Sequence, residues 1–392
     1  MRGFAFAGVH CGIKEGRARD LALLVSDRSA VVAAAYTKSS VPGAPVLVSR
    51  RRSRRGSARG VVVNSGISNV AMGEQGVADA EAMAAAAAQA VGCRPAEMLV
   101  ASTGVIGVPL PMDRIRSGIE DAARVLSPDD LKRAADAIRT TDTVAKLAMR
   151  RVRVGERFVN IAGIAKGSGM IEPHMATMLA FLCTDASVEA PVLRGLWSDV
   201  VEETFNRVTI DGETSTSDTA IVLANGAGGG RPLSSARGEG ARRLRNGLVT
   251  VCTELAQALA RDGEGATKLV TVEVAGARSP AEAERAGRRI ANSMLVKTAL
   301  FGRDPNWGRI LQTVGAGEVQ LDLARTEVDL CGISVFRHGA STGEGARVRA
   351  GTRMTAPEIT IRIHLGAGRA RARFWTCDLS YEYVRINAEY TT

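Results

Sequence analysis

The alternation of short aliphatic segments with long helix-forming segments is the feature that most limits how this chain can fold. The segment RGVVVNSG (59–66) has the composition of a buried strand that ends in a turn, and GVADAEAMAAAAAQAVG (76–92) is a strong helix former. Three earlier segments, LALLVSD, AVVAAAYT and APVLVS, are rich in Val and Leu and bounded by turn residues, so we predict them to be strands of one sheet. This order of strands and helices predicts a layered α/β fold.

The second half of the chain continues this pattern and then changes. Helices are predicted at about 190–205 and 238–261. From about residue 280 a helical segment, PAEAERAGRRIANSM, is followed by the predicted strands EVQLDLA, EVDLCGISVF and EITIRIHL. The last third therefore reads as a separate α+β lobe.

An arginine run accounts for much of the formal net charge of +10. Residues 49–59 (SRRRSRRGSAR) contain six arginines, no acidic residue and no aromatic ring on which a base could stack. We interpret this run as a solvated loop between two strands and not as a nucleic-acid-binding arm. The alternative, a basic nucleic-acid-binding protein, predicts salt-sensitive binding that depends on these arginines.

Cysteine spacing and hydropathy indicate the compartment and the absence of a metal. The six cysteines form no C-x-x-C pair and have no histidine at metal-ligand spacing, so they are predicted to be thiols and not a zinc site. No apolar run approaches the roughly 18 residues that a membrane helix needs, and the N-terminal stretch does not resemble a signal peptide. We expect a cytoplasmic protein with no membrane or nucleic-acid partner, no metal and no cofactor.

The segment KGSGMIEPHMATML (166–179) carries the most specific chemical signal. Thr177 stands where an irregular Gly/Pro segment meets an apolar strand. A chain break between Ala176 and Thr177 would give Thr177 a free α-amino group, whose pKa near 7.7–8.0 suits a base for its own hydroxyl. Taken alone, the segment is more typical of a Gly-rich loop that leads into a core strand.

Blocks along almost the whole chain resemble the ornithine acetyltransferase family, also called the glutamate N-acetyltransferases of arginine biosynthesis. The blocks are VVVNSG (61–66), ASTGVIG (101–107), TTDT (140–143), KGSGMIEPHMATML (166–179), TFNRVTIDGETSTSDT (204–219), DGEGATK (262–268), LVKTALFGRDPNWGRI (295–310) and the terminal YVRINAEYTT. Their number and order make a chance match implausible.

The resemblance implies a fold and a division of the chain. The implied fold is α/β, a layered α-β-β-α-like sandwich of the self-processing ornithine acetyltransferase/aminopeptidase type with a smaller C-terminal α+β lobe. Self-cleavage would give an α chain (1–176) and a β chain (177–392) that stay together in an α2β2 assembly. Within the β chain, residues 177–280 would complete the catalytic domain and residues 281–392 would form the lobe.

The resemblance also assigns the reacting groups. Thr177 is the expected nucleophile, and Ala176 and Thr177 flank the cleaved bond. Thr103 and Gly104 are expected to form the oxyanion hole, and a glycine there lets its backbone N–H approach the oxyanion closely.

Six residues are expected to bind substrate. They are Thr140, Lys166, Thr177, Glu264, Asn387 and Thr392, with Glu264 facing the distal ammonium of ornithine. The spacing to Lys166 leaves Thr141 and Thr143 as alternatives to Thr140.

The implied reaction is acetyl transfer from N2-acetylornithine to glutamate through an acetyl-Thr177 intermediate. Whether acetyl-CoA is a second donor stays open. Two enzyme alternatives share the nucleophile: an N-terminal-nucleophile amidohydrolase or aminopeptidase, which passes the acyl group to water, and a specialised-metabolism paralogue with another acceptor. The three activities differ in the acceptor of the acyl group, which is glutamate, water or another amino acid.

Overall fold

The computed structural model describes residues 1–172 and 178–389, and these residues divide into two compact units. The first unit comprises residues 1–206 and 213–255, and the second comprises 207–212 and 256–391 as far as they are described. The described residues of the predicted C-terminal lobe, 281–389, lie within the second unit, which also takes in residues 256–280. Three residues named above, Ala176, Thr177 and Thr392, lie outside the described residues.

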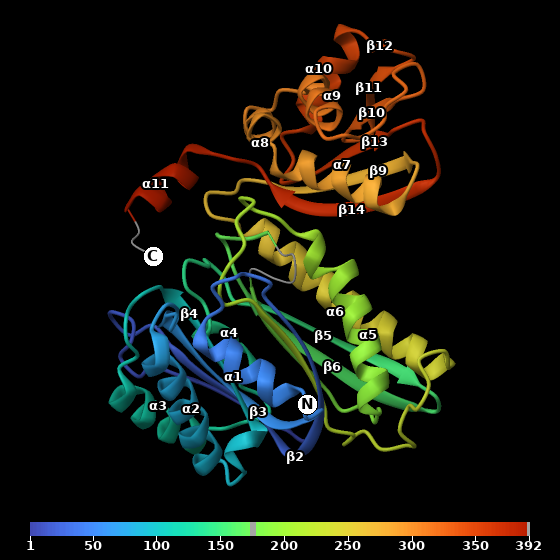
Figure 1. Cartoon of the computed structure of the whole chain (residues 1–392). Helices are drawn as coiled ribbons and strands as arrows, with labels where there is room; N and C mark the ends of the chain where they lie inside the picture. Colours follow the sequence, from blue (N-terminus) through green and yellow to red (C-terminus); the bar gives the residue numbers. More distant parts are fainter. Residues whose placement is uncertain (173–177, 390–392) are drawn as a thin grey trace. The chain divides into compact units, whose positions relative to one another are not determined.

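The first unit is built on one sheet of eight strands in the described residues, with the order β4-β3-β2-β8-β7-β6-β5 and β1 paired to β2 (Figure 1). Its strands are β1 (Phe4–Val9), β2 (Leu21–Tyr36), β3 (Ser57–Ile67), β4 (Met98–Val105), β5 (Lys146–Val154), β6 (Arg157–Lys166), β7 (Leu179–Thr184) and β8 (Thr219–Ala224). Its helices are α1 (Ala44–Ser53), α2 (Gly73–Ala90), α3 (Met112–Arg124), α4 (Leu131–Ala137), α5 (Ala190–Glu203) and α6 (Glu239–Arg261), the last of which continues past the unit boundary.

The long strand β2 lets this sheet form two layers. Its first half pairs with β1 and β3, and its second half, after a register shift between Val25 and Ala30, pairs with β8. One buried cluster joins side chains of β1–β4, such as Val63, to side chains of β6–β8, such as Phe181. The two halves of the sheet therefore pack face to face, as in a β-sandwich.

Helices cover both outer faces of this sandwich. Helices α1, α2 and α3 share a second buried cluster with the opposite faces of β2, β3 and β4. On the other side Trp197 of α5 donates to the carbonyl of Ala220 in β8, and Gly163 of β6 leaves room for Val251 and Leu255 of α6. The predicted α-β-β-α layering is confirmed.

The second unit has its own mixed sheet, with the order β12-β11-β10-β13-β9-β14, and its own core. Its strands are β9 (Leu269–Ala277), β10 (Glu327–Leu330), β11 (Ile333–Arg337), β12 (Ala340–Ser341), β13 (Glu358–His364) and β14 (Ala370–Cys377). Its helices are α7 (Pro280–Asn292), α8 (Met294–Phe301), α9 (Trp307–Gly315), α10 (Glu344–Arg353) and α11 (Tyr381–Glu389). The predicted α+β character of this part of the chain is confirmed.

Two of the predicted strands are wrong, and two others form a single strand. APVLVS (44–49) lies in helix α1, where Pro45 occupies the first turn and arginines occupy the last, both of which favour a helix. EVQLDLA (318–324) is not a strand, because the Gln320 N–H donates to the carboxylate of Glu282 and not to a neighbouring strand. LALLVSD and AVVAAAYT are two parts of the single strand β2. EVDLCGISVF is not one strand but two, β10 and β11, which pair antiparallel.

The arginine run is also structured, contrary to the predicted solvated loop. Its first half forms the last turn of α1, where Arg52 is buried, donates to the Met98 carbonyl at 2.6 Å and pairs with Glu81. Arg50 donates to the Thr37 carbonyl at 2.7 Å. These guanidinium groups therefore help to hold α1 against its neighbours.

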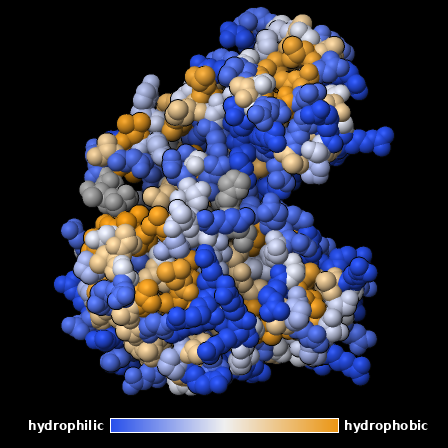
Figure 2. All heavy atoms as spheres, in the orientation of Figure 1, coloured by the Kyte–Doolittle hydropathy of each residue, from blue (hydrophilic) through white to orange (hydrophobic). Residues whose placement is uncertain are grey.

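The hydropathy of the surface varies from place to place. Figure 2 shows hydrophilic residues over much of one face, with hydrophobic residues gathered in separate patches. Among the described residues there is no helix with the length and hydropathy required to span a bilayer.

Candidate functional site

Lys166 is the centre of the site in the first unit. It ends strand β6, its side chain is buried, and its ammonium donates to two hydroxyl oxygens, Thr140 Oγ1 at 2.8 Å and Thr103 Oγ1 at 3.2 Å. The structure thus brings together three residues that the sequence places in separate blocks. An ammonium has only donors, so both threonine oxygens act as acceptors here, and their own hydroxyl protons remain for other partners.

Thr103 and Gly104 stand at the end of β4, where β4 runs parallel to β3. Gly104 has φ of +127°, and a Cβ there would lie 2.2 Å from the carbonyl carbon of Gly66. Only glycine can hold this backbone so close to its neighbour. The end of β3 is itself fixed, because Asn64 donates to the Ile67 carbonyl at 2.8 Å and accepts from the hydroxyl of Ser102.

The polar segment 140–143 points its side chains at different partners. Thr140 meets Lys166, whereas the hydroxyl of Thr141 lies 2.7 Å from the hydroxyl of Ser168. Of the alternatives left open by the sequence, Thr140 contacts Lys166, and Thr141 contacts Ser168 in the glycine-rich segment.

Asp142 is a site residue that the sequence analysis missed. Its buried carboxylate accepts from Lys146 at 2.7 Å, from the backbone N–H of Gly167 at 2.6 Å and from that of Thr140 at 3.1 Å. Burial works to raise its pKa, but the positive charges of Lys166 and Lys146 and these hydrogen bonds outweigh it and lower the pKa to about 2. Asp142 is thus an anion that fixes the backbone on both sides of the Lys166–Thr140 contact.

A second buried carboxyl, Asp218, behaves in the opposite way. It immediately precedes β8, and its side chain is buried. Burial raises its pKa well above the usual value, against the opposing effects of the Met178 backbone and the charge of Lys166. The group is therefore favoured in its neutral, protonated form.

Glu264 and Asn387 belong to the second unit and contact each other. Asn387, on α11, donates to Glu264 Oε2 at 2.8 Å and to the Tyr383 carbonyl at 3.0 Å. Gly265 has φ of +68° and lies against the backbone of Tyr383, and Ser380 donates to its carbonyl at 2.6 Å. The start of the last helix is therefore tied to the loop that carries Glu264.

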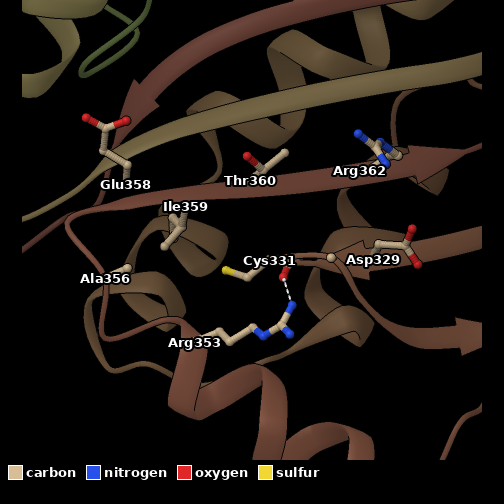
Figure 3. A pocket seen from close by; sticks show the side chains of 9 residues that line it. Asp329, Cys331, Arg353, Ala356, Glu358, Ile359, Thr360 and Arg362 are labelled. Atoms are coloured by element: carbon tan, nitrogen blue, oxygen red, sulfur yellow. Dashed lines mark hydrogen bonds between the residues drawn. The ribbon is translucent and has the colours of Figure 1, made fainter.

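A separate hollow of about 450 Å³ lies within the second unit (Figure 3). Its lining includes Cys331, Arg353 and Arg362, and the guanidinium of Arg353 donates to the carbonyl of Cys331 at 3.0 Å. Its lining contains none of the predicted site residues that the structure describes.

Comparison with known proteins gives one consistent result. The model of the ArgJ family matches residues 5–392. The arginine biosynthesis bifunctional protein ArgJ of Geobacter sulfurreducens is 46% identical over 392 residues, covering 100% of both chains. The counterpart from Symbiobacterium thermophilum is 45% identical and covers 100% of this chain and 97% of its own.

A solved structure agrees with these relatives. The crystal structure of arginine biosynthesis bifunctional protein ArgJ from Bacillus halodurans is 37% identical, with a TM-score of 0.51, and covers 53% of this chain and 96% of its own.

Proposed function

Because the chain belongs to the ArgJ family and is an ornithine acetyltransferase of arginine biosynthesis, we propose that it works through an acetyl ester on Thr177. In this proposal the chain first breaks between Ala176 and Thr177, giving the α chain 1–176 and the β chain 177–392. The new α-amino group of Thr177 is then the base for its hydroxyl.

The contact of Lys166 with both Thr103 and Thr140 is the observation that supports this proposal most directly. The Thr103 hydroxyl accepts from Lys166, so its own proton is available to a developing oxyanion, together with the backbone N–H of Gly104. Lys166 and Thr140 offer a cation and a hydroxyl for the carboxylate of an amino-acid substrate.

Each half-reaction balances with these groups alone. Thr177 Oγ attacks the acetyl carbon of N2-acetylornithine, its proton passes to the α-amino group, and that group protonates the departing amine of ornithine. The amine of glutamate then attacks the ester, its proton passes to the α-amino group and on to Thr177 Oγ, and N-acetylglutamate leaves. The step needs no cofactor.

The remaining assignments complete the proposal. Glu264 receives the distal ammonium of ornithine, with its carboxylate oriented by Asn387, and Thr392 closes the substrate site. The two chains stay together as α2β2 in the cytoplasm, where the free state of all six cysteines agrees with a reducing compartment. Because the relatives are named as bifunctional proteins, we include acetyl-CoA as a second acetyl donor.

Two measurements test the proposal. Intact mass should give two fragments for the wild type and one unbroken chain for Thr177→Ala. Acetylornithine added without glutamate should release a burst of ornithine equal to the enzyme concentration. An active, uncut wild-type chain that never carries acetyl would disprove the mechanism, and free acetate as the main product in the presence of glutamate would favour an amidohydrolase.

A further inference from the structure

Lys14 lies beside the Lys166 site, on a loop whose backbone is fixed by a buried carboxylate. Asp20, which is fully buried, accepts from the backbone N–H groups of Cys11 at 2.6 Å, Ile13 at 2.7 Å and Lys14 at 3.0 Å. Three charge-assisted hydrogen bonds to one buried carboxylate make a rigid loop. The direction in which the Lys14 side chain leaves the loop is therefore set by the fold.

The hydrocarbon part of Lys14 packs over the strand end that supports the oxyanion residues. A Cβ at Gly66 would lie 3.3 Å from Lys14 Cγ and 2.8 Å from Ile13 Cγ2. Gly66 in turn pairs with Gly104. Contacts therefore run from Lys14 to Gly66 and from Gly66 to Gly104. The lysine side chain runs along the β3 edge of the site.

The ammonium of Lys14 ends next to Thr140. Its Nζ donates to the carbonyl of Arg139 at 2.6 Å and to the carbonyl of Arg19 at 2.9 Å. Arg139 directly precedes Thr140, the residue that contacts Lys166. An ammonium has three N–H donors, so these two carbonyls leave capacity for one more acceptor.

The charges around Lys14 favour an anion as that acceptor. The charged groups that act on it are Lys166 and Arg139, which are positive, and Asp20 and Asp142, which are negative. Both carboxylates are already engaged, Asp20 by the loop and Asp142 by Lys146 and two backbone N–H groups. Burial is the largest effect and lowers the pKa of Lys14 to about 8, so it stays mostly a cation at neutral pH.

We infer that Lys14 is a specificity-determining residue that binds the side-chain carboxylate of the acetyl acceptor. This inference rests on the proposed function, in which one site receives in turn a substrate with a distal ammonium and an acceptor with a second carboxylate. Lys166 serves the carboxylate that both substrates share. Lys14 serves the carboxylate that only the dicarboxylic acceptor carries.

Two substitutions separate this role from a structural one. Lys14→Gln removes the charge but keeps an amide that can donate to the Arg19 and Arg139 carbonyls, and Lys14→Met removes charge and donors together. Lys132→Gln, at an exposed position on α4, is the matched control. Each protein is loaded with acetylornithine, and transfer is then measured to glutamate and to glutamine, which has the same shape without the charge.

The expected result is a loss of discrimination. In both Lys14 variants the ratio of kcat/KM for glutamate to that for glutamine should fall about tenfold or more, mainly through KM for glutamate, as for loss of one charge-assisted hydrogen bond. Lys14→Arg should restore part of the ratio, and Lys132→Gln should leave it unchanged.

Other outcomes contradict the inference. Lys14 would be a structural residue if the ratio of kcat/KM for glutamate to that for glutamine is unchanged in Lys14→Gln. The same conclusion would follow if the rate with glutamate falls only by the same factor as the burst of ornithine. Should Lys14→Met fail to fold, Lys14→Gln decides the matter alone. A wild type that transfers acetyl to neither acceptor would instead refute the proposed function, so the two failures are distinguishable.

Discussion

The carboxylate of Asp142 lies 2.7 Å from the ammonium of Lys146, and both side chains are completely buried. The same carboxylate holds the backbone of Thr140 and Gly167, which flank the Lys166 contact in space. One buried anion therefore organises both the packing and the polar geometry of the site, and its protonation should affect both.

Acid should weaken the first unit through Asp142. The pKa of Asp142 in the folded protein, about 2, lies below the ordinary value of an aspartate, so the stabilisation is fully present above about pH 4 and is lost as pH falls through about 2. A shift of this size corresponds to about 2 kcal/mol. Urea unfolding of the wild type at pH 6, 3 and 2 measures the loss.

Asp142→Asn should remove this acid dependence and destabilise the protein at pH 7 by about 3 kcal/mol, because it takes a carboxylate partner from a buried lysine. Asp113→Asn, at a fully exposed carboxylate on α3, is the control and should change neither quantity measurably. An Asp142→Asn protein as stable as the wild type at pH 7 would show that the ion pair contributes little.

Gly104→Ala should be far more harmful than Gly107→Ala. Both glycines have positive φ, but a Cβ at Gly104 would meet the backbone of Gly66 at 2.2 Å, whereas no atom of the described residues lies within 4 Å of a Cβ at Gly107. We expect a difference of about 2 kcal/mol or more in the free energy of unfolding. Equal stabilities in urea would contradict the close approach of β3 and β4 at this point.

Thr140→Val should raise KM for acetylornithine about tenfold, because it removes the hydroxyl that contacts Lys166. Thr141→Val breaks the contact with Ser168 instead and should have a smaller effect on KM. Steady-state kinetics of both variants make the comparison. If Thr141→Val proves the more damaging to KM, the assignment of Thr140 to substrate is wrong.

Asp218→Asn should stabilise the protein more at pH 8 than at pH 4. The pKa of Asp218 is raised in the folded state, so this carboxyl favours folding below its unfolded pKa and opposes it as pH rises toward the folded pKa. The amide has no charge to bury. Thermal unfolding of the wild type and the variant at pH 8 and pH 4 measures the stabilisation at each pH. A stabilisation confined to pH 4 would contradict a raised pKa of Asp218 in the folded state.

Local patterns in the sequence predicted most of the elements correctly. The helix predicted at 76–92, the buried strand at 59–66 and the helix predicted at 280–294, observed as α7 over 280–292, follow from composition and periodicity, which act over a few residues. The failure at 44–49 has the same origin, since a short apolar run does not by itself distinguish strand from helix, and Pro45 was the signal for a helix start.

The sequence by itself determined the family, the blocks that carry its chemistry and the residue types available to the site. Only the tertiary structure decided which of these side chains meet. Thr103, Thr140 and Lys166 come from separate segments, and their contact depends on how β2 joins two layers and on the register of β3 with β4. Asp142 and Lys14 escaped prediction for the same physical reason: a charged residue in a loop acquires its role from long-range neighbours, and these do not appear in the local pattern of the chain.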